Sequence, residues 1–310
     1  MSVLTDADDE LHTPRPGDPT WAETCWFAAQ VPERSIGIWT YPLFRTNLGV
    51  MSTSVYVWGP EGSELWQQPY YRLYWHQPIP EGLRLTDFEA PTGLAYRRLE
   101  PLTSYEVRYT DGDAISLEMR FDAIHRPHEL GIAEDYGHID QLGRITGELV
   151  LHGERIEIDC VEMRDRTWSP RRERRDRTWL TYSYGAVDGE TAFHCATRVN
   201  RELEQQLLGG FTLRGGAMHE LTEGRRRAER DAEGRPKRIV VEGRDETGAE
   251  VQVVGDVVSQ MAMHTSPYLC FISQVRWELP DGSIAWGEDQ DTWSPGLWRA
   301  LRSDLIAGRR

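Results

Sequence analysis

The chain of 310 residues has almost no lysine: Lys237 is its only one, and its other basic side chains are arginines and nine histidines. Lys237 lies in Gly234–Arg238, a Gly- and Pro-containing sequence typical of a turn. Schiff-base and pyridoxal phosphate chemistry need a desolvated lysine, which such a turn does not provide. We therefore expect no lysine-linked cofactor.

Cysteines and long apolar runs are scarce as well. Cys25, Cys160, Cys195 and Cys270 are far apart and lack metal-ligand spacing, so we expect reduced, mostly buried thiols. No stretch approaches the roughly 20 apolar residues that span a bilayer. Residues Met1–Thr20 are acidic and proline-punctuated, without the basic and apolar regions of a signal peptide. The sequence thus predicts a cytoplasmic protein with no membrane span.

Signals for nucleotides, nucleic acids and metals are missing too. A net charge of −15 argues against nucleic acid, which needs a broad basic surface. There is no glycine-rich phosphate loop, no Gly-x-Ser-x-Gly elbow and no cysteine beside a histidine. His125 and His128 flank Pro127 with no third ligand nearby, so we expect no zinc. We expect no metal and no cofactor, and the oligomeric state stays open.

What the chain does contain is a series of short β-rich runs between turn signals. Two-residue turns such as Asp111-Gly112, His152-Gly153 and Asp281-Gly282 separate runs rich in Val, Ile, Thr and aromatic residues, which is typical of antiparallel hairpins. Helical patterns are limited to 201–208 and to a segment that starts at Ser294-Pro295. We predict an all-β protein with few short helices.

Length alone suggests two domains. We expect residues 1–18 to form a flexible N-terminal tail, 19–155 a first β-barrel domain, and 156–310 a second β-barrel domain with a C-terminal helix. Each half reads as several meandering strands, as if one barrel-like unit were used twice.

The densest group of charged and aromatic residues is Arg-Asp-Arg-Thr-Trp, which occurs at Arg164–Trp168 and again at Arg175–Trp179. If the first copy is extended, Arg164, Arg166 and Trp168 face one side and Asp165 faces the other. Asp165 and Trp168 then cannot line one pocket unless the chain is bent there.

Three segments carry a resemblance to a known superfamily: Gly137–Leu149, Gly153–Asp159 and Arg164–Arg171. They resemble the hydroxyneurosporene synthase (carotenoid 1,2-hydratase)-like proteins and their bacterial relatives, which carry an Arg-Asp-His-Ser-Trp-Gly-Pro-Arg type segment. Trp21–Phe27, Gly82–Leu85 and Asp281–Glu288 sit in the expected order, so the resemblance covers nearly the whole chain after the tail.

The resemblance implies two lipocalin-like (calycin) antiparallel β-barrels packed together, with a hydrophobic pocket at or near their junction. Relatives include hydratases of isoprenoid chains, cyclases of polyketide-like substrates and lipid-binding proteins. This chain has Arg166 where relatives have a histidine and Ser169 where they have a glycine. A guanidinium does not exchange protons near neutral pH, so catalysis by a histidine at this position is excluded here.

Asp165 is the first candidate for a catalytic carboxylate. Its sequence neighbours Arg164 and Arg166 would hold it ionised, as a base or a charge partner, unless strong burial outweighs them. The alternative is a structural Asp–Arg network. His138 and Asp140 form a second candidate pair, because they share a face if the chain is extended and could transfer protons together. A buried histidine with a structural partner is the alternative reading.

Further residues are candidates for binding the substrate. The arginines beside Asp165 could hold a carboxylate or an enolate oxygen, and aromatic side chains could wall an apolar pocket or serve only as core packing. The predicted substrate-binding residues are Arg164, Arg166, Trp168, Arg171, Trp21, Glu23, Trp75, His76, Tyr182 and His194. His194 is expected to point into the second barrel.

Two functions compete. The first is a cofactor-independent hydratase, dehydratase or isomerase that acts on a hydrophobic isoprenoid, steroid or polyketide-like molecule by acid–base chemistry in a pocket at the barrel junction. The second is a non-catalytic carrier or sensor of a lipid-like ligand. A carrier needs an apolar cavity with few polar groups, whereas an enzyme needs Asp165 or His138 to reach a cavity with fixed polar partners.

Overall fold

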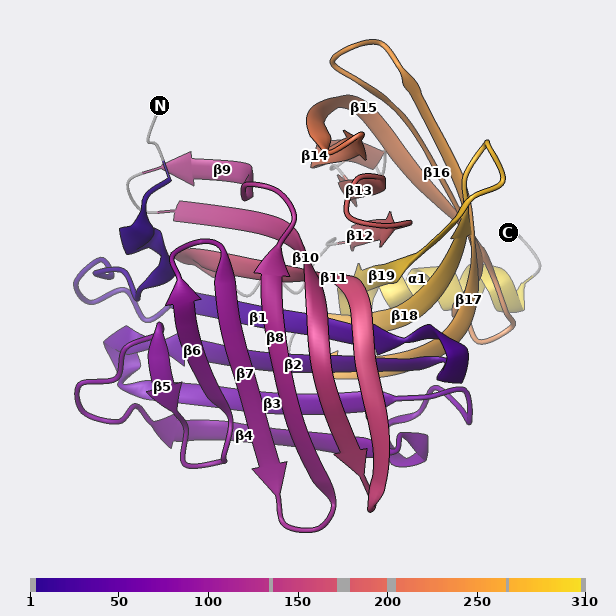
Figure 1. Ribbon diagram of the computed structural model, residues 1–310. Helices are drawn as coiled ribbons and strands as arrows, with labels where there is room; N and C mark the ends of the chain where they lie inside the picture. The colour runs from indigo at the N-terminus through magenta and orange to yellow at the C-terminus, as the bar shows by residue number, and fades with distance from the viewer. Residues whose placement is uncertain (1–3, 134–135, 172–178, 200–204, 266–267, 308–310) are drawn as a thin grey trace. The chain divides into compact units, whose positions relative to one another are not determined.

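The computed structural model describes residues 4–133, 136–171, 179–199, 205–265 and 268–307. These residues form antiparallel strands and a single α-helix, which confirms the all-β prediction (Figure 1). The chain divides into two compact units after residue 172, except that Arg34–Ile36 and Trp58–Gln68 belong to the second unit.

Unit 1 is built on an eleven-stranded sheet with the order β4-β3-β2-β1-β11-β10-β8-β7-β6-β5, and β9 pairs with β10 outside this path. Its strands are β1 (Trp21–Val31), β2 (Ile36–Arg45), β3 (Val50–Trp58), β4 (Tyr70–Pro78), β5 (Asp87–Glu89), β6 (Ala95–Glu100), β7 (Ser104–Asp111), β8 (Ile115–Ala123), β9 (His128–Ala133), β10 (Tyr136–Leu151) and β11 (Glu154–Pro170). Its 3₁₀ turns are η1 (Asp6–Asp9), η2 (Pro32–Arg34) and η3 (Thr46–Leu48), and η4 (Leu65–Gln67) lies in the second unit.

The sheet of unit 1 curls over so that β1–β4 lie across the layer made by β6, β7, β8, β10 and β11 (Figure 1). The space between the layers is filled with aromatic rings. Phe27 on β1 packs against Tyr96, Tyr105 and Phe121 at centroid distances of 5.1 to 5.5 Å. The concave side of the sheet is therefore the core of unit 1.

The longest hairpin of unit 1 joins β10 to β11 through His152 and Gly153. Both residues have positive φ, 51° and 85°, as the tight two-residue hairpin turn requires. β11 then pairs with β10 along one edge and with β1 along the other, so it belongs to unit 1. This is why the division comes after β11 and not at residue 155, where we expected it.

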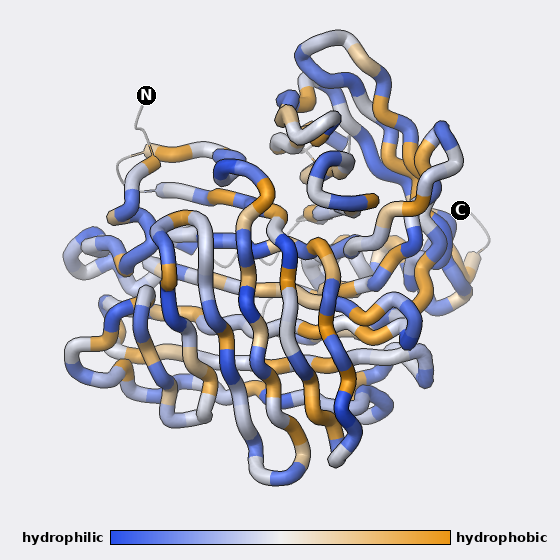
Figure 2. Tube along the Cα trace, viewed as in Figure 1, coloured by the Kyte–Doolittle hydropathy of each residue, from blue (hydrophilic) through white to orange (hydrophobic). Residues whose placement is uncertain are grey.

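Unit 2 contains a closed eight-stranded barrel in which each strand pairs with the next and β12 pairs with β19. Its strands are β12 (Trp179–Ala186), β13 (Ala192–Val199), β14 (Gln205–Arg214), β15 (Ala217–Arg230), β16 (Pro236–Asp245), β17 (Glu250–Thr265), β18 (Tyr268–Glu278) and β19 (Ile284–Trp293). Apolar and polar residues mix along the strands (Figure 2), and buried residues alternate with less buried ones along β7 and β8, as expected for strands with one core-facing side. In contrast, β1 is buried along its whole length.

The C-terminal helix α1 (Pro295–Ile306) begins where it was predicted, with Ser294 at the N-cap position and Pro295 at the first helical position. Trp298 packs it against Phe271 and Trp293. The helix predicted at 201–208 is wrong where it can be tested, because residues 205–208 start β14. Residues 201–204 lie outside the described residues. Within the described part of the chain, no helix is both long and apolar enough to cross a bilayer.

The N-terminal segment that we expected to be a flexible tail makes specific contacts with unit 1. Asp9 is buried and accepts hydrogen bonds from Tyr105 and from the backbone of Leu102. Glu10 accepts from the backbone of Leu85, and His12 stacks on Trp168 at a centroid distance of 4.1 Å. Polar side chains anchor this segment, a possibility that its composition alone did not indicate.

Candidate active site on unit 1

The first Arg-Asp-Arg-Thr-Trp segment is extended, as the period-two argument required. It lies in β11, where Asp165 pairs with Trp26 of β1 and with Asp140 of β10. Arg164 pairs with Phe27, so its side chain shares the face that looks into the concave core. Asp165 and its neighbours two residues away therefore project from the opposite, convex face.

On this convex face the register brings both predicted catalytic groups together. His138 lies opposite Thr167, and Asp140 lies opposite Asp165, on two neighbouring strands. Residues opposite each other in an antiparallel pair share a face, so these four side chains form one cluster. It contains the three residues predicted to be catalytic, and we call it the acid–base cluster.

The acid–base cluster is linked by a chain of hydrogen bonds. His138 Nε2 lies 3.1 Å from Asp140 Oδ1, and His138 Nδ1 lies 2.8 Å from Thr167 Oγ1. Thr167 Oγ1 donates to Asp165 Oδ2 at 3.0 Å. All four residues are at most 9% exposed. Asp165 Oδ1 is buried and accepts no hydrogen bond from the described residues, so this oxygen has a free acceptor position.

Burial raises the pKa of Asp165 to about 6, and the charge of Asp140 adds to the rise, while His138 and Arg171 oppose it. We expected Arg164 and Arg166 to hold this carboxyl ionised. That expectation does not describe the folded chain, because the two arginines point to the other face of β11. Asp165 instead exchanges its proton close to neutral pH, as a general acid or base should.

Burial lowers the pKa of His138, but the charge and hydrogen bond of Asp140 and the charge of Asp165 outweigh it, so the net shift is upward. A raised pKa favours the imidazolium form. His138 thus lies between the carboxyl groups of Asp140 and Asp165, and the Thr167 hydroxyl links it to Asp165.

Arg171, one of the predicted substrate-binding residues, lies at the end of β11 on the same side as the acid–base cluster. Its guanidinium donates to Thr24 Oγ1 at 3.0 Å and to Tyr41 Oη at 3.2 Å. Its charge lowers the pKa of both Asp165 and His138. Arg171 thereby places a fixed positive charge beside the cluster.

Three aromatic residues of β1 and β2 lie near Asp165: Trp26, whose sequence position allowed either pocket lining or core packing, and Trp39 and Tyr41, which we did not predict. Trp26 is the register partner of Asp165 and stacks on Trp39 at 4.8 Å, and Trp39 in turn lies 6.2 Å from Tyr41. Alternation along β1 could have revealed Trp26, because it must face opposite to Glu23 and Cys25. Trp39 and Tyr41 lie on β2, and only the pairing of strands brings them near Asp165.

The other predicted binding residues near Asp165 lie on its opposite face. Glu23 forms a buried ion pair with Arg166 and accepts a hydrogen bond from Trp21 Nε1 at 3.1 Å. Trp168 lies across from Gly137, where a Cβ would clash with the indole ring. Arg164, Arg166, Trp168, Trp21 and Glu23 thus form a buried group that does not line one site with Asp165.

Trp75 and His76 are also apart from the acid–base cluster. They lie in a bulge of β4, an edge strand, and the Trp75 side chain is 51% exposed. His76 has a φ of 49°, so the backbone here is locally irregular. Trp66, in the same aromatic-rich stretch, is 81% exposed. These side chains do not wall a closed pocket.

Tyr182 and His194 belong to unit 2, where their rings stack at 5.7 Å. Phe193 and Cys195 belong to the hydrophobic core of the barrel, and His194 alternates to the other side of β13 and contacts Phe211. The expectation that His194 points into the barrel is therefore wrong. The second copy of the pentapeptide is outside the described residues except for Trp179, whose ring stacks on Trp293 at 4.4 Å.

The acid–base cluster also has the residue types of a cation site. His138, Asp140 and Asp165 each offer a ligand atom, and these atoms lie within 4.8 Å of one another. Carboxylate and imidazole are common ligands of divalent metals. The hydrogen bonds through Thr167 already link these groups without an ion, so a metal is not required to explain their arrangement.

Comparison with known sequences gives one family match. The family described as "Domain of unknown function (DUF7064)" matches residues 5–287. No curated protein matches the chain in sequence.

Solved structures show the same fold at low sequence identity. CghA matches with a TM-score of 0.62 and 10% identity, covering 92% of this chain and 93% of its own. CghA with Sch210972 matches with a TM-score of 0.61, 11% identity, and coverage of 91% and 93%. Kievitone hydratase from Nectria haematococca matches with a TM-score of 0.58 and 11% identity, covering 92% of each chain. These likenesses agree with the fold that the sequence resemblance implied.

Proposed function

This chain belongs to the DUF7064 family, and we propose that it is a cofactor-independent enzyme that adds water to, or removes water from, a hydrophobic substrate by acid–base chemistry at the acid–base cluster of unit 1. The observation that carries the proposal is Asp165, a buried carboxyl with a pKa of about 6 that is linked through Thr167 to the His138–Asp140 pair. Perturbed titratable groups of this kind mark functional sites.

In the direction of hydration, protonated Asp165 gives its proton to one carbon of a substrate double bond. The π electrons form the new C–H bond, and the neighbouring carbon becomes cationic. A water oxygen then attacks that carbon, and the carboxylate of Asp165 takes up the proton that the water loses. One water molecule is consumed and Asp165 is restored. Dehydration follows the same steps in reverse.

The remaining residues of the cluster support these steps electrostatically. Between the two proton transfers, Asp165 is a carboxylate, and the imidazolium of His138 stabilises it through the Thr167 hydroxyl. Asp140 holds His138 in its charged form. Fixed charges of this kind lower a barrier without reorganising during the reaction.

The aromatic residues beside Asp165 suit a substrate that passes through a cation. Indole rings stabilise positive charge through their π faces, and Trp26 is the cross-strand neighbour of Asp165. Arg171 suits an oxygen-bearing substituent on the same molecule. These features favour an unsaturated isoprenoid, steroid or polyketide-like compound, and one of the solved neighbours is named as a hydratase, which supports the same class of reaction.

A hydroxyneurosporene synthase mechanism in the strict sense has less support. Arg166, which replaces the histidine of those proteins, is buried on the opposite face from Asp165 and pairs with Glu23. The residue that differs from the family pattern therefore contributes to the core of unit 1, and the acid–base role falls to His138, Asp140 and Asp165.

The alternative function, a carrier of lipid-like ligands, calls for an apolar cavity. Unit 2 has a cavity of about 560 Å³ on its β14–β17 side, but charged or amide side chains provide most of its lining. This cavity does not suit an apolar ligand, and neither Asp165 nor His138 lines it. The carrier hypothesis is favoured only if ligands bind without conversion in the experiment that follows.

The experiment is an ¹⁸O-incorporation screen. The full chain is incubated in H₂¹⁸O with unsaturated and hydroxylated isoprenoids, steroids and polyketide-like compounds, and products are analysed by mass spectrometry. Wild type should introduce ¹⁸O into at least one compound, and Asp165→Asn should lose this activity. Asp159→Asn is the matched control, because Asp159 lies on the same strand, is exposed and pairs only with Arg144 among the contacts seen. Equal ¹⁸O incorporation by wild type and Asp165→Asn contradicts the proposal.

A further inference from the structure

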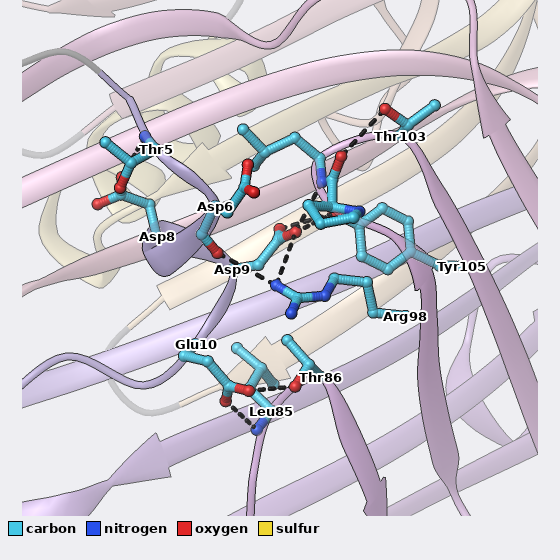
Figure 3. A network of polar contacts seen from close by, with 12 residues as sticks. Thr5, Asp6, Asp8, Asp9, Glu10, Leu85, Thr86, Arg98, Thr103 and Tyr105 are labelled. Atoms are coloured by element: carbon cyan, nitrogen blue, oxygen red, sulfur yellow. Dashed lines mark hydrogen bonds and ion pairs between the residues drawn. The ribbon is translucent and has the colours of Figure 1, made fainter.

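The carboxylate of Asp9 lies in a socket made by unit 1 (Figure 3). The Tyr105 hydroxyl donates to it at 2.7 Å, and the backbone N–H of Leu102 donates at 2.7 Å. Arg98 Nη1 lies 3.6 Å away and Arg164 Nη1 lies 3.5 Å away. We call these four groups the carboxylate socket. None of them belongs to the N-terminal segment, so the socket is a property of the sheet.

The carboxylate socket has more positive charge than the Asp9 carboxylate neutralises and more hydrogen-bond donors than it accepts from. Two guanidinium groups face one carboxylate. Arg164 is 1% exposed, and its Nε donates to Gln141 at 2.8 Å, but its Nη2 has no acceptor within the described residues. A buried guanidinium nitrogen without an acceptor is costly and uncommon. The socket therefore holds one donor that the Asp9 carboxylate does not satisfy.

The backbone of the socket is also held in an unusual conformation. Leu102 has a φ of 54°, in the left-handed region that non-glycine residues rarely adopt. This conformation accompanies the hydrogen bond from the Leu102 N–H to the Asp9 carboxylate. Strained backbone of this kind is most often kept at binding sites.

Behind the socket lies an aromatic wall. The guanidinium of Arg164 lies over the ring of Tyr105 at 4.3 Å and near the ring of Phe121 at 5.9 Å. Phe27 completes this group from β1. A carboxylate bound in the socket would have its attached carbon atoms next to apolar rings.

The N-terminal segment that contains Asp9, residues 4–12, makes polar contacts with unit 1. Asp9 is the only buried residue between Leu4 and Thr20. Its neighbour Glu10 accepts from the N–H of Leu85 at 3.0 Å and from the hydroxyl of Thr86 (Figure 3). Glu10 also binds Arg84 at 2.9 Å. Residues 4–12 are also held by the stack of His12 on Trp168 and by the hydrogen bonds of His12 with Glu23. A competing anion can replace the contacts of Asp9 within this set.

We propose that the carboxylate socket is a binding site for an apolar molecule with a terminal carboxylate, and that residues 4–12 form a displaceable strap whose Asp9 fills the socket when this ligand is absent. The ligand carboxylate takes the place of the Asp9 side chain, accepts from Tyr105 and Leu102, and pairs with Arg98 and Arg164. This site uses the concave face of unit 1. It is independent of the acid–base cluster, so either proposal can fail alone.

The direct test is hydrogen–deuterium exchange on the full chain with octanoate as the probe. Octanoate should increase exchange of the amides in residues 5–12 and leave Leu102 protected, because its N–H is hydrogen-bonded to a carboxylate in both states. Octanol and octyltrimethylammonium, which have the same tail without a carboxylate, should change neither. If the amides of residues 5–12 are unaffected by saturating octanoate, or respond equally to all three compounds, the proposal is overturned.

A variant pair makes the test quantitative. Asp9→Ala empties the socket, and removing the internal competitor should tighten octanoate binding at least tenfold over wild type in calorimetry. Asp8→Ala is the matched control, since Asp8 lies on the same strap and contacts only Thr5 and His12 among the pairs seen. Adding Tyr105→Phe to Asp9→Ala removes one donor and should weaken octanoate binding. Equal octanoate affinity in Asp9→Ala and Asp8→Ala also overturns the proposal. Binding of acetate without binding of octanoate overturns it as well, because the site would then not accept a ligand with an apolar tail.

Discussion

Asp165 and Asp140 lie directly opposite each other on β11 and β10, at 5% and 0% exposure. Two neighbouring buried carboxyls resist carrying charge together, and this repulsion adds to the effect of burial on the pKa of Asp165. The pair is stable in the folded chain because His138 lies between the two carboxyls and contacts both. This relationship is the basis of the first three predictions.

Asp165→Asn should lower turnover by about 10² to 10⁴-fold, the usual contribution of a general acid or base. The amide keeps the shape of the side chain, so folding should be retained. Steady-state kinetics on the compound identified by ¹⁸O incorporation measure the loss, and circular dichroism checks the fold. If Asp165→Asn gives no soluble, folded protein, the result would favour a structural role for Asp165 instead.

The stability of the chain should depend on pH through Asp165. Its pKa rises from 3.8 to about 6 on folding, mainly because of burial. Between pH 4 and 6 the folded chain binds more protons at this carboxyl than the unfolded chain, so the free energy of unfolding falls as pH rises through this window. In Asp165→Asn this contribution disappears.

Relative to wild type, Asp165→Asn should therefore gain about 2 to 3 kcal/mol of stability between pH 4 and pH 7. Urea unfolding at both pH values measures the difference. Asp159→Asn is the control: the pKa of exposed Asp159 is lowered by its hydrogen bond to Arg144, so its small effect should have the opposite sign. If the free energies of unfolding of wild type and variant differ by the same amount at pH 4 and at pH 7, the pKa of Asp165 is not raised in the folded chain.

Thr167→Val should interrupt proton sharing without removing either charged group. The Thr167 hydroxyl joins His138 to Asp165, and valine has nearly the same shape. We expect turnover to fall about tenfold and the pH optimum to shift, with a stability cost of about 1 to 2 kcal/mol for the lost hydrogen bonds. Thr181→Val serves as the control, because Thr181 is equally buried and bonds to Thr197 in unit 2. An unchanged pH profile in Thr167→Val would mean that Thr167 does not link the two groups.

Glu23→Gln should destabilise unit 1 and leave the chemistry of the acid–base cluster intact. The change leaves Arg166, 1% exposed, without its anionic partner, and breaking a buried ion pair costs about 3 to 5 kcal/mol. Thermal unfolding measures the loss. Glu148→Gln breaks the exposed pair with Arg155 and should cost less than about 1 kcal/mol. If Glu23→Gln alters the reaction rate while stability stays constant, the group on the concave face takes part in catalysis after all.

Much of the fold followed from local patterns. His152-Gly153 predicted a tight hairpin, and Ser294-Pro295 predicted the start of α1, because both signals depend on backbone preferences of a few adjacent residues. The predicted helix at 201–208 was wrong where residues 205–208 can be seen, since pairing of β14 with β13 outweighs a short stretch of helix-favouring residues.

The site was partly predictable for the same reason. Alternation along β11 separated Asp165 from Arg164, Arg166 and Trp168 correctly, and alternation along β10 put His138 and Asp140 on one face. It did not say which face was concave. We therefore expected the arginines to control the ionisation of Asp165, whereas its pKa is set by burial and by Asp140 across the strand pair.

The sequence by itself determined the β-rich class, the hairpin turns and the residues that share a face, because these depend on neighbours along the chain. The predicted turn at His152-Gly153 also sets the register of β10 and β11, which places Asp140 opposite Asp165. Only the tertiary structure decided that Trp26 lies against Asp165, and that Asp9 occupies a socket formed by residues about 90 to 155 positions away. Register between distant strands depends on packing and burial over the whole sheet. No turn joins β1 to β11, so local sequence patterns do not specify how these two strands pair.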